Sequence, residues 1–170
     1  SQKSSGKIIR CGGLAMQKLI ILNTRDIKKI RELMMDQYGA FFTGDYAYVQ
    51  NANGKLFLIN KDIVKVDLEK LRVDKIGLYV AEVKDNSVRL GKEGAQLLAK
   101  ENPDSLKQVV ALDKEEIKLY FTGADLKKDL GGKSRYILIK YENNIIGCSK
   151  YKEGTILNYL PKINRGEVII

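Results

Sequence analysis

The 170-residue sequence contains no histidine and only two cysteines. Without histidine the chain cannot supply a Ser–His or Cys–His catalytic pair, an imidazole base or a histidine-containing metal site. Cys11 and Cys148 lie far apart and give no disulfide framework or zinc motif, which fits a reducing compartment. Dense acidic clusters are also missing. We therefore expect no catalytic residues, no metal and no cofactor.

Long apolar runs are absent as well. No stretch of about 18 apolar residues is present to span a bilayer, and the first residues lack the apolar core of a secretory signal. We expect no membrane association and a cytoplasmic protein. The net charge is instead +9, which favours a polyanionic partner such as nucleic acid, although many Lys- and Glu-rich proteins are simply heavily charged.

The first half of the chain predicts an α/β domain over residues 16–104, preceded by a flexible tail over 1–15. Asn23 or Thr24 caps a helix whose apolar residues recur on one face until Gly39. Residues 40–60 predict a β-meander with a turn at 51–54, and residues 75–83 another strand. Residues 61–71 fit either a strand or a short helix. A short helix then ends near Pro103, where we place the domain boundary.

The second half predicts a small mixed barrel over residues 105–170, so the chain as a whole belongs to the α+β class. A strand at 107–112 leads into a helix with a capping box formed by Asp113 and Glu116, and Gly123 ends that helix in a left-handed conformation. Two strands then flank a hairpin turn for which Asn143 and Asn144 supply positive φ angles. Residues 155–161 and 166–170 supply the remaining strands.

Gly132-Lys133-Ser134 resembles the end of a phosphate-binding loop. Such a loop needs a glycine four residues earlier, and it follows a strand and opens a helix. Here position 127 is a lysine, and the tripeptide precedes a strand. These departures from the motif argue against a nucleotide hydrolase. The two glycines at 131 and 132 are better explained as a bend into the strand. Lys133 and Arg135 would stand at the barrel rim, where they can meet an acidic partner.

Positive charge is concentrated late in the chain. Residues 127–165 hold nine Lys and Arg and three Asp and Glu, so nine minus three gives +6 of the total +9. Tyrosines at 136, 141, 151 and 159 interleave with them and are more often packed than exposed, with Tyr151 the best candidate for stacking on a base. No DNA-reading motif is visible, so single-stranded or looped RNA is the favoured ligand.

The segment "VVALDKEEIKLYFTGADLKKDL" followed by "RYILIKYENNIIGCSKY" resembles the PUA domain, an RNA-binding module. With "IKKIRELMMDQYG", "KLFLINKDIVKV" and "LYVAEVKDNSVRLGKEGAQLLA" before it, residues 24–170 resemble the Nip-seven family of ribosome-biogenesis factors. The resemblance implies an N-terminal α/β domain on a PUA domain, no catalysis, nucleolar location in a eukaryote, and a role in pre-rRNA processing and large-subunit assembly. It also implies RNA contacts from basic residues late in the chain and from the turn after the helix.

The candidate RNA-binding residues come from the charge pattern and the resemblance together, and are Lys150, Tyr151, Lys152, Lys162, Arg165, Gly123, Lys127, Lys133 and Arg135. At Lys127 the sequence departs from the Pro-Gly that often follows this turn in PUA domains. We expect pre-rRNA as ligand and other assembly proteins as partners of the N-terminal domain. Alternatives are a PUA protein of translation initiation, an accessory subunit of an RNA-modifying enzyme, and a protein-binding adaptor without RNA affinity.

Overall fold

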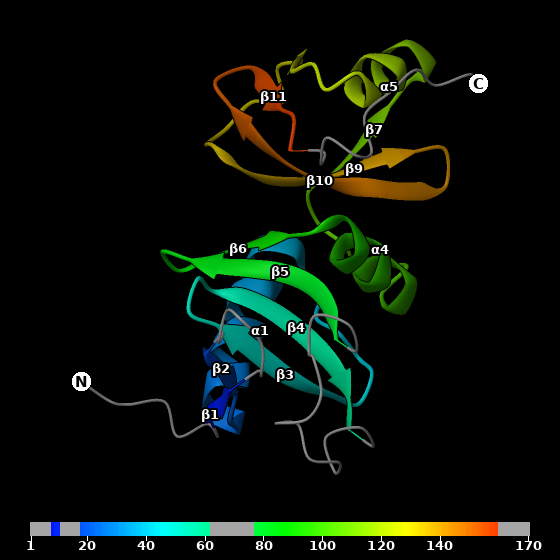
Figure 1. Cartoon of the computed structure of the whole chain (residues 1–170). Helices are drawn as coiled ribbons and strands as arrows, with labels where there is room; N and C mark the ends of the chain where they lie inside the picture. The colour runs from blue at the N-terminus through cyan, green and yellow to red at the C-terminus, as the bar shows by residue number, and fades with distance from the viewer. Residues whose placement is uncertain (1–7, 11–17, 62–76, 160–170) are drawn as a thin grey trace.

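The computed structural model describes residues 8–10, 18–61 and 77–159, and it has an α+β architecture with two sheets (Figure 1). The first sheet has six antiparallel strands in the order β1-β2-β3-β4-β5-β6. Its strands are β1 (Ile8–Arg10), β2 (Lys18–Ile21), β3 (Tyr46–Asn51), β4 (Lys55–Asn60), β5 (Leu78–Lys84) and β6 (Ser87–Leu90). The meander expected over residues 40–60 is thus the β3–β4 hairpin.

Residues 8–10 correct the expectation of a flexible tail over 1–15. Ile8 pairs with Ile20 and Arg10 with Lys18, so β1 forms the edge of the first sheet. Two β-branched isoleucines in this short segment suit an edge strand, a signal that the surrounding Gly and Ser residues concealed.

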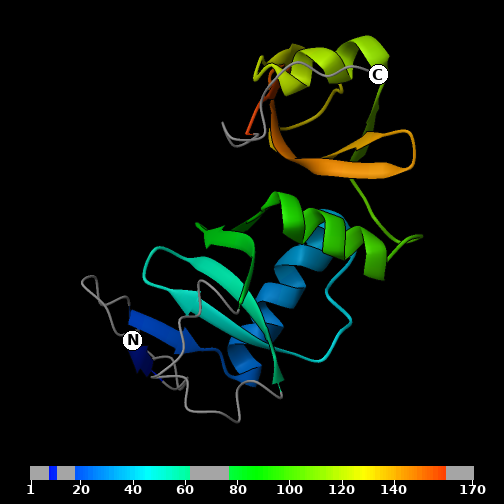
Figure 2. The ribbon, with the colours of Figure 1, turned by 45° about the vertical axis from the view of Figure 1, so that its right-hand side comes forward.

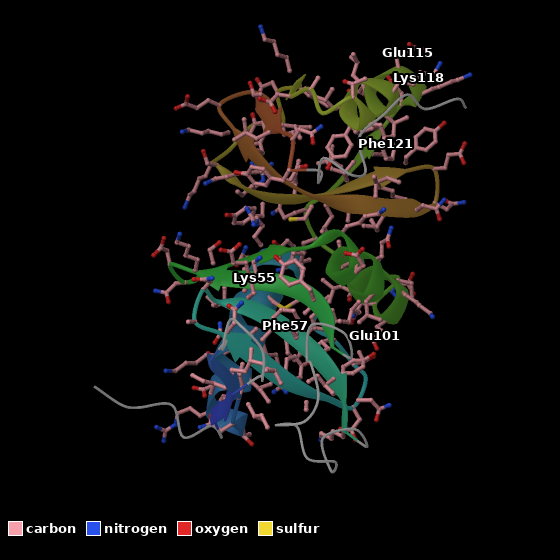
Figure 3. All side chains as sticks on the ribbon, viewed as in Figure 1. Lys55, Phe57, Glu101, Glu115, Lys118 and Phe121 are labelled. Atoms are coloured by element: carbon pink, nitrogen blue, oxygen red, sulfur yellow. The ribbon has the colours of Figure 1, made fainter. Side chains whose placement is uncertain are left out.

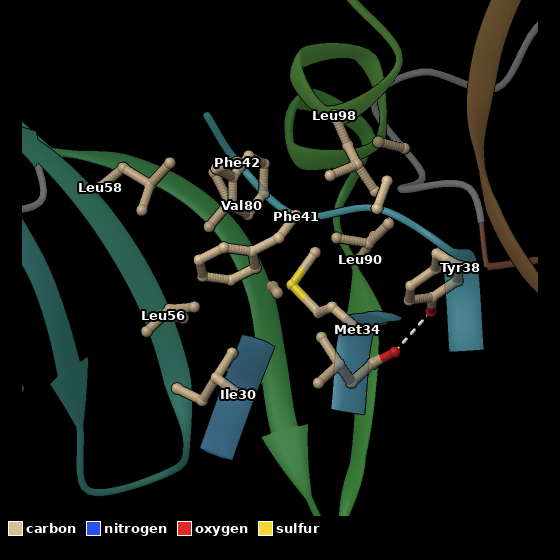
Figure 4. Close-up of a cluster of buried hydrophobic side chains, with 14 of the residues drawn as sticks. Ile30, Met34, Tyr38, Phe41, Phe42, Leu56, Leu58, Val80, Leu90 and Leu98 are labelled. Carbon is tan, nitrogen blue, oxygen red and sulfur yellow. Dashed lines mark hydrogen bonds between the residues drawn. The ribbon is translucent and has the colours of Figure 1, made fainter. Parts of the chain in front are cut away.

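Helix α1 (Thr24–Tyr38) packs on one face of the first sheet (Figure 2). Asn23 caps it by accepting from the Asp26 backbone N–H at 2.9 Å, and Gly39 ends it at φ 72°, both as predicted. The buried face inserts Met34 between α1 and the sheet, beside Phe41 and Leu90 (Figure 4). The hydroxyl of Tyr38 donates to the carbonyl of Val88, which ties the end of α1 to β6.

Helix α4 (Lys92–Glu101) lies between the two sheets and packs against β5 and against the second sheet (Figure 2). Its approach to β5 depends on Gly94, because a Cβ at this position would overlap the Val80 carbonyl. At its C-terminal end, Glu101 accepts from the backbone N–H groups of Thr43 and Gly44, both at 3.1 Å. Residues 62–76, which contain most of the ambiguous 61–71 segment, lie outside the described residues.

The second sheet has the order β7-β9-β10-β11-β8 and curls into a half-barrel compatible with a PUA-like fold. Its strands are β7 (Val109–Leu112), β8 (Leu126–Lys127), β9 (Arg135–Tyr141), β10 (Asn144–Lys152) and β11 (Thr155–Leu157), and only β7 and β9 pair in parallel among them. Helix α5 (Lys114–Phe121) covers its concave side, with the predicted capping box and with Gly123 at φ 93°. Residues 166–170, another expected strand, lie outside the described range.

One expectation about the β9–β10 hairpin is wrong. Glu142, at φ 52°, takes the left-handed conformation, whereas Asn144 already begins β10. The hairpin register places Asn144 opposite Tyr141, which leaves Glu142 and Asn143 as the two turn residues.

Both faces of β9 and β10 are buried in part. Ile137, Ile139 and Tyr151 point into the core under α5, whereas Leu138 and Cys148 join the core of the first sheet. The two sheets therefore pack directly on one another. The chain passes from α4 to β7 through residues 102–108, and the domain boundary at 104 stays a prediction.

Candidate nucleic-acid interface

The outer face of the second sheet carries a row of basic side chains beyond the part covered by the first sheet. Tyr151 and Ile156 point into the core, so their neighbours on the strands point outward. Lys152 pairs with Thr155, and Thr155 pairs with Lys127 on its other side. Lys127 and Lys152 thus lie two strand spacings apart, about 10 Å.

We call Lys127, Lys150, Lys152 and Thr155 the basic strip. Lys127 and Lys152 are exposed, and Lys150 is half-buried with its Nζ 5.6 Å from the centre of the Tyr136 ring. No carboxylate of the described residues forms an ion pair with these three lysines or with Lys133. Their charges are therefore available to a polyanion, which distinguishes them from the neighbouring Lys128, whose Nζ lies 2.9 Å from Glu116.

Arg135 is engaged in holding the loop that precedes it. Its Nη1 donates to the carbonyls of Gly131 at 2.7 Å and Lys133 at 2.9 Å, and its Nε donates to Gln108 at 2.9 Å. The guanidinium also lies 4.9 Å from the centre of the Tyr151 ring. Arg135 thus positions Lys133, which is exposed on the loop.

Tyr151 requires a correction, because its ring is only 2% exposed and offers no stacking face to a base. Its hydroxyl instead donates to Asp129 at 2.9 Å and accepts from the backbone N–H groups of Leu130 at 3.1 Å and Gly154 at 3.2 Å. The hydrogen bonds from the Gly131 N–H and from Tyr151 hold the pKa of Asp129 below its usual value. Tyrosines flanked by lysines on a strand alternate with them across the sheet, which explains the burial.

The remaining predicted RNA-binding residues and tyrosines do not lie on the basic strip or are outside the described residues. Gly123 follows α5, where Asn158 fixes the turn by donating to the carbonyls of Tyr120 and Ala124. Lys162 and Arg165 lie outside the described residues. Tyr136 remains half-buried on the outer face, and Tyr159 is 38% exposed with Arg89 over its ring.

A cleft between the two sheets adjoins the basic strip. It has a volume of about 390 Å³. Its lining residues are Arg135, Tyr136 and Lys150 from β9 and β10, Leu33, Asp36 and Gln37 from α1, and Ser134, Asn86, Ser87 and Gln108 from other segments. This cleft could not be predicted from the sequence, because its walls come from five separate segments. The sequence analysis singled out Arg135, Tyr136 and Lys150 for their charge or aromatic character, and Ser134 as part of the Gly132-Lys133-Ser134 tripeptide.

Neither a metal-binding cluster nor a membrane span is found in the described part of the chain. Residues 8–10, 18–61 and 77–159 contain no group of three or more Cys, Asp or Glu side chains arranged to hold a metal ion. None of the helices in these ranges is long and apolar enough to cross a membrane.

The part of the chain that holds the second sheet is similar to a domain of known proteins. Residues 107–165 match the family model described as "Methyltransferase RsmF PUA domain". The chain is 30% identical over 95 residues to Ribosomal RNA small subunit methyltransferase F of Vibrio vulnificus strain YJ016, which covers 56% of this chain and 19% of that protein. The protein of the same name from Vibrio cholerae serotype O1 strain M66-2 is 27% identical over 95 residues, covering 56% and 20%.

The match therefore spans about a fifth of the length of these curated relatives. The finer resemblance to the Nip-seven family finds no support in these comparisons, since the relatives are named as ribosomal RNA methyltransferases. The family match over residues 107–165 and the half-barrel sheet within residues 107–159 agree that the C-terminal part of the chain contains a PUA-like domain.

Proposed function

We propose that the chain is an RNA-binding module that serves an enzyme modifying ribosomal RNA. The observation that carries this proposal is the basic strip, which lies on a PUA-like domain whose relatives are named as ribosomal RNA methyltransferases. Unpaired lysines on an open sheet face suit the phosphates of RNA, because each neutralised phosphate releases counterions.

The chemistry of methyl transfer is assigned to another part of the enzyme or to a partner. Within this chain the proposed task is to bind and orient the RNA, since the chain matches the PUA domain of these methyltransferases and about a fifth of their length. The protein partner would dock elsewhere than on the basic strip, which the RNA occupies.

The second candidate is the large-subunit assembly factor implied by the Nip-seven resemblance. It shares the RNA-binding task but requires no modifying enzyme. The comparisons favour the modification role, because the relatives are named for methylation of small-subunit ribosomal RNA.

Deletion of the chain in its own cells separates the two candidates. The modification role predicts that methylation mapped across ribosomal RNA is lost at one or a few nucleotides, while large subunits accumulate normally on sucrose gradients. Loss of large subunits with methylation intact would favour assembly. If neither changes, and ultraviolet cross-linking recovers no ribosomal RNA with the chain, the proposed function is wrong.

A further inference from the structure

The loop over residues 129–134 is held in one conformation by its surroundings. Arg135 binds the carbonyls of Gly131 and Lys133, and the Asp129 carboxylate accepts from the Gly131 N–H at 2.9 Å. Gly131 and Gly132 have φ angles of 70° and 77°, a region that favours glycine. A Cβ on Gly131 would meet no atom within 4 Å, so glycine is favoured here by the positive φ angle and not by a close neighbour.

This arrangement leaves backbone donors without acceptors. Gly132, Lys133 and Ser134 are exposed residues, and no described residue accepts a hydrogen bond from their backbone N–H groups. Arg135 binds the carbonyls of Gly131 and Lys133, and the Asp129 carboxylate already accepts from the Gly131 N–H and the Tyr151 hydroxyl. The donors that remain for an anion are these three N–H groups and the Lys133 ammonium. Consecutive backbone N–H groups in a tight turn form a concave site for anions.

The adjoining cleft offers complementary groups for the rest of a nucleotide. Its volume of about 390 Å³ lies in the lower range of small-molecule sites. Tyr136 and Leu33 supply apolar surface, and the side chains of Asn86 and Ser87 have no hydrogen-bond partner among the described residues. The Gln37 amide, by contrast, is fully engaged with the backbone of Val88.

Charge within the cleft is divided between its two walls. Lys150 and Arg135 lie on the wall formed by β9 and β10, whereas Asp36 lies on the α1 wall. A phosphate therefore favours the side of the loop and Lys150, and a base with its hydrogen-bond donors favours the side of Asp36.

We propose that the loop and the cleft together bind one unpaired nucleotide of an RNA, with its phosphate on the loop N–H groups, Lys133 and Lys150, and its base in the cleft. The inference rests on the proposed RNA-binding function and assigns its ligand contacts. The basic strip continues from Lys150 to Lys152 and Lys127, so the neighbouring phosphates of the same strand have cations beside them.

The test is fluorescence anisotropy of the full chain with a labelled eight-nucleotide single-stranded RNA over a salt series. A Lys133→Gln/Lys150→Gln variant removes two phosphate contacts and is expected to flatten the log–log salt slope by roughly 1.4. Lys114→Gln/Lys118→Gln is the matched control, because it removes two charges from α5, on the far side of the second sheet (Figure 3). The control is expected to keep the parental slope.

Two uncharged changes test the base in the cleft. Ser87→Tyr fills the cleft and is expected to weaken binding about tenfold, the size of one lost stacked base, with the salt slope unchanged. Asn86→Gly removes a carboxamide from a residue at φ 57°, where glycine causes no strain, and is expected to weaken binding several-fold. Thermal unfolding of both variants checks that they fold.

The outcomes distinguish the inference from the proposed function. If the parent binds RNA and both cleft variants bind equally well, the nucleotide site is wrong and the RNA-binding function stands. If the lysine pair and its α5 control flatten the slope equally, the phosphate assignment is wrong. If a nucleoside monophosphate at the same concentration displaces the RNA, the ligand of the site is a free nucleotide and the proposed RNA site is wrong. If the parent chain does not bind RNA, both proposals are refuted.

Discussion

Replacing Tyr151 with Phe distinguishes a tyrosine that stacks on an RNA base from one whose hydroxyl stabilises the fold. A residue that stacks on a base loses little when only its hydroxyl is removed, since the ring remains. In the structure, the hydroxyl binds Asp129, Leu130 and Gly154, so its loss affects the folded protein itself.

The expected cost follows from these three hydrogen bonds. Each contributes on the order of 0.5–1.5 kcal/mol, and because the three partners are only partly shielded from water, we expect about 2 kcal/mol in total. For a chain of this size such a loss lowers the melting temperature by about 4–8 °C. The pKa of Asp129 is expected to rise toward its usual value, because one of the two hydrogen bonds that stabilise its charged form is gone.

Urea unfolding followed by circular dichroism measures the stability, and carbon-detected NMR titration measures the Asp129 pKa. Because that pKa is depressed in the folded state, the stability it confers is present at neutral pH and is lost as the pH falls through the folded value. The free energy of unfolding of the Tyr151→Phe variant should therefore fall less than that of the parent when the pH is lowered. A variant as stable as the parent, with an unchanged Asp129 pKa, would refute this account of Tyr151.

Three further changes test the packing between and within the sheets. Gly94→Ala should destabilise the chain by about 1–3 kcal/mol or more in urea unfolding, because the new methyl overlaps the Val80 carbonyl; unaltered stability would contradict the close approach of α4 to β5. Tyr120→Phe should cost about 1–3 kcal/mol, because it leaves the fully buried Ser149 hydroxyl without its 2.9 Å partner, and a neutral result would contradict that hydrogen bond. Burial raises the pKa of the Cys148 thiol from 9.0 to about 11. In a Cys11→Ser background, alkylation of Cys148 should therefore be slow. The free energy of unfolding should also fall as the pH rises from about 9 to 11, because the unfolded chain then loses the thiol proton while the folded chain keeps it. Fast alkylation of the folded chain at pH 8, or an identical alkaline stability profile after Cys148→Ala, would contradict the buried position.

Local signals in the sequence predicted helix α5 and the two ends of α1 well. The capping box at Asp113 and the left-handed Gly39 and Gly123 each depend on residues within four positions of one another, so their conformation is determined locally. The turn at Glu142 was mispredicted because asparagine has the stronger preference for positive φ, while the pairing of β9 with β10 fixed which residues form the turn.

The binding surface was predictable only as a concentration of charge. Lys150 and Lys152 stood out in the sequence, but their alignment with Lys127 depends on β11 lying between β10 and β8, and sheet order is not a local property. The cleft is lined by residues about 100 positions apart in the sequence, such as Asp36 and Arg135. Tyr151 was misassigned because composition does not distinguish the two faces of a strand.

The most direct test of the central claim is an NMR titration of the isotopically labelled chain with a single-stranded RNA of eight nucleotides. The account predicts that the amide signals of Gly132, Lys133, Ser134, Lys150 and Lys152 shift together and saturate, while those of Glu115 and Lys118 on α5 stay in place. No shift at any RNA concentration, or shifts confined to the first sheet, would contradict RNA binding by the outer face of the PUA-like domain.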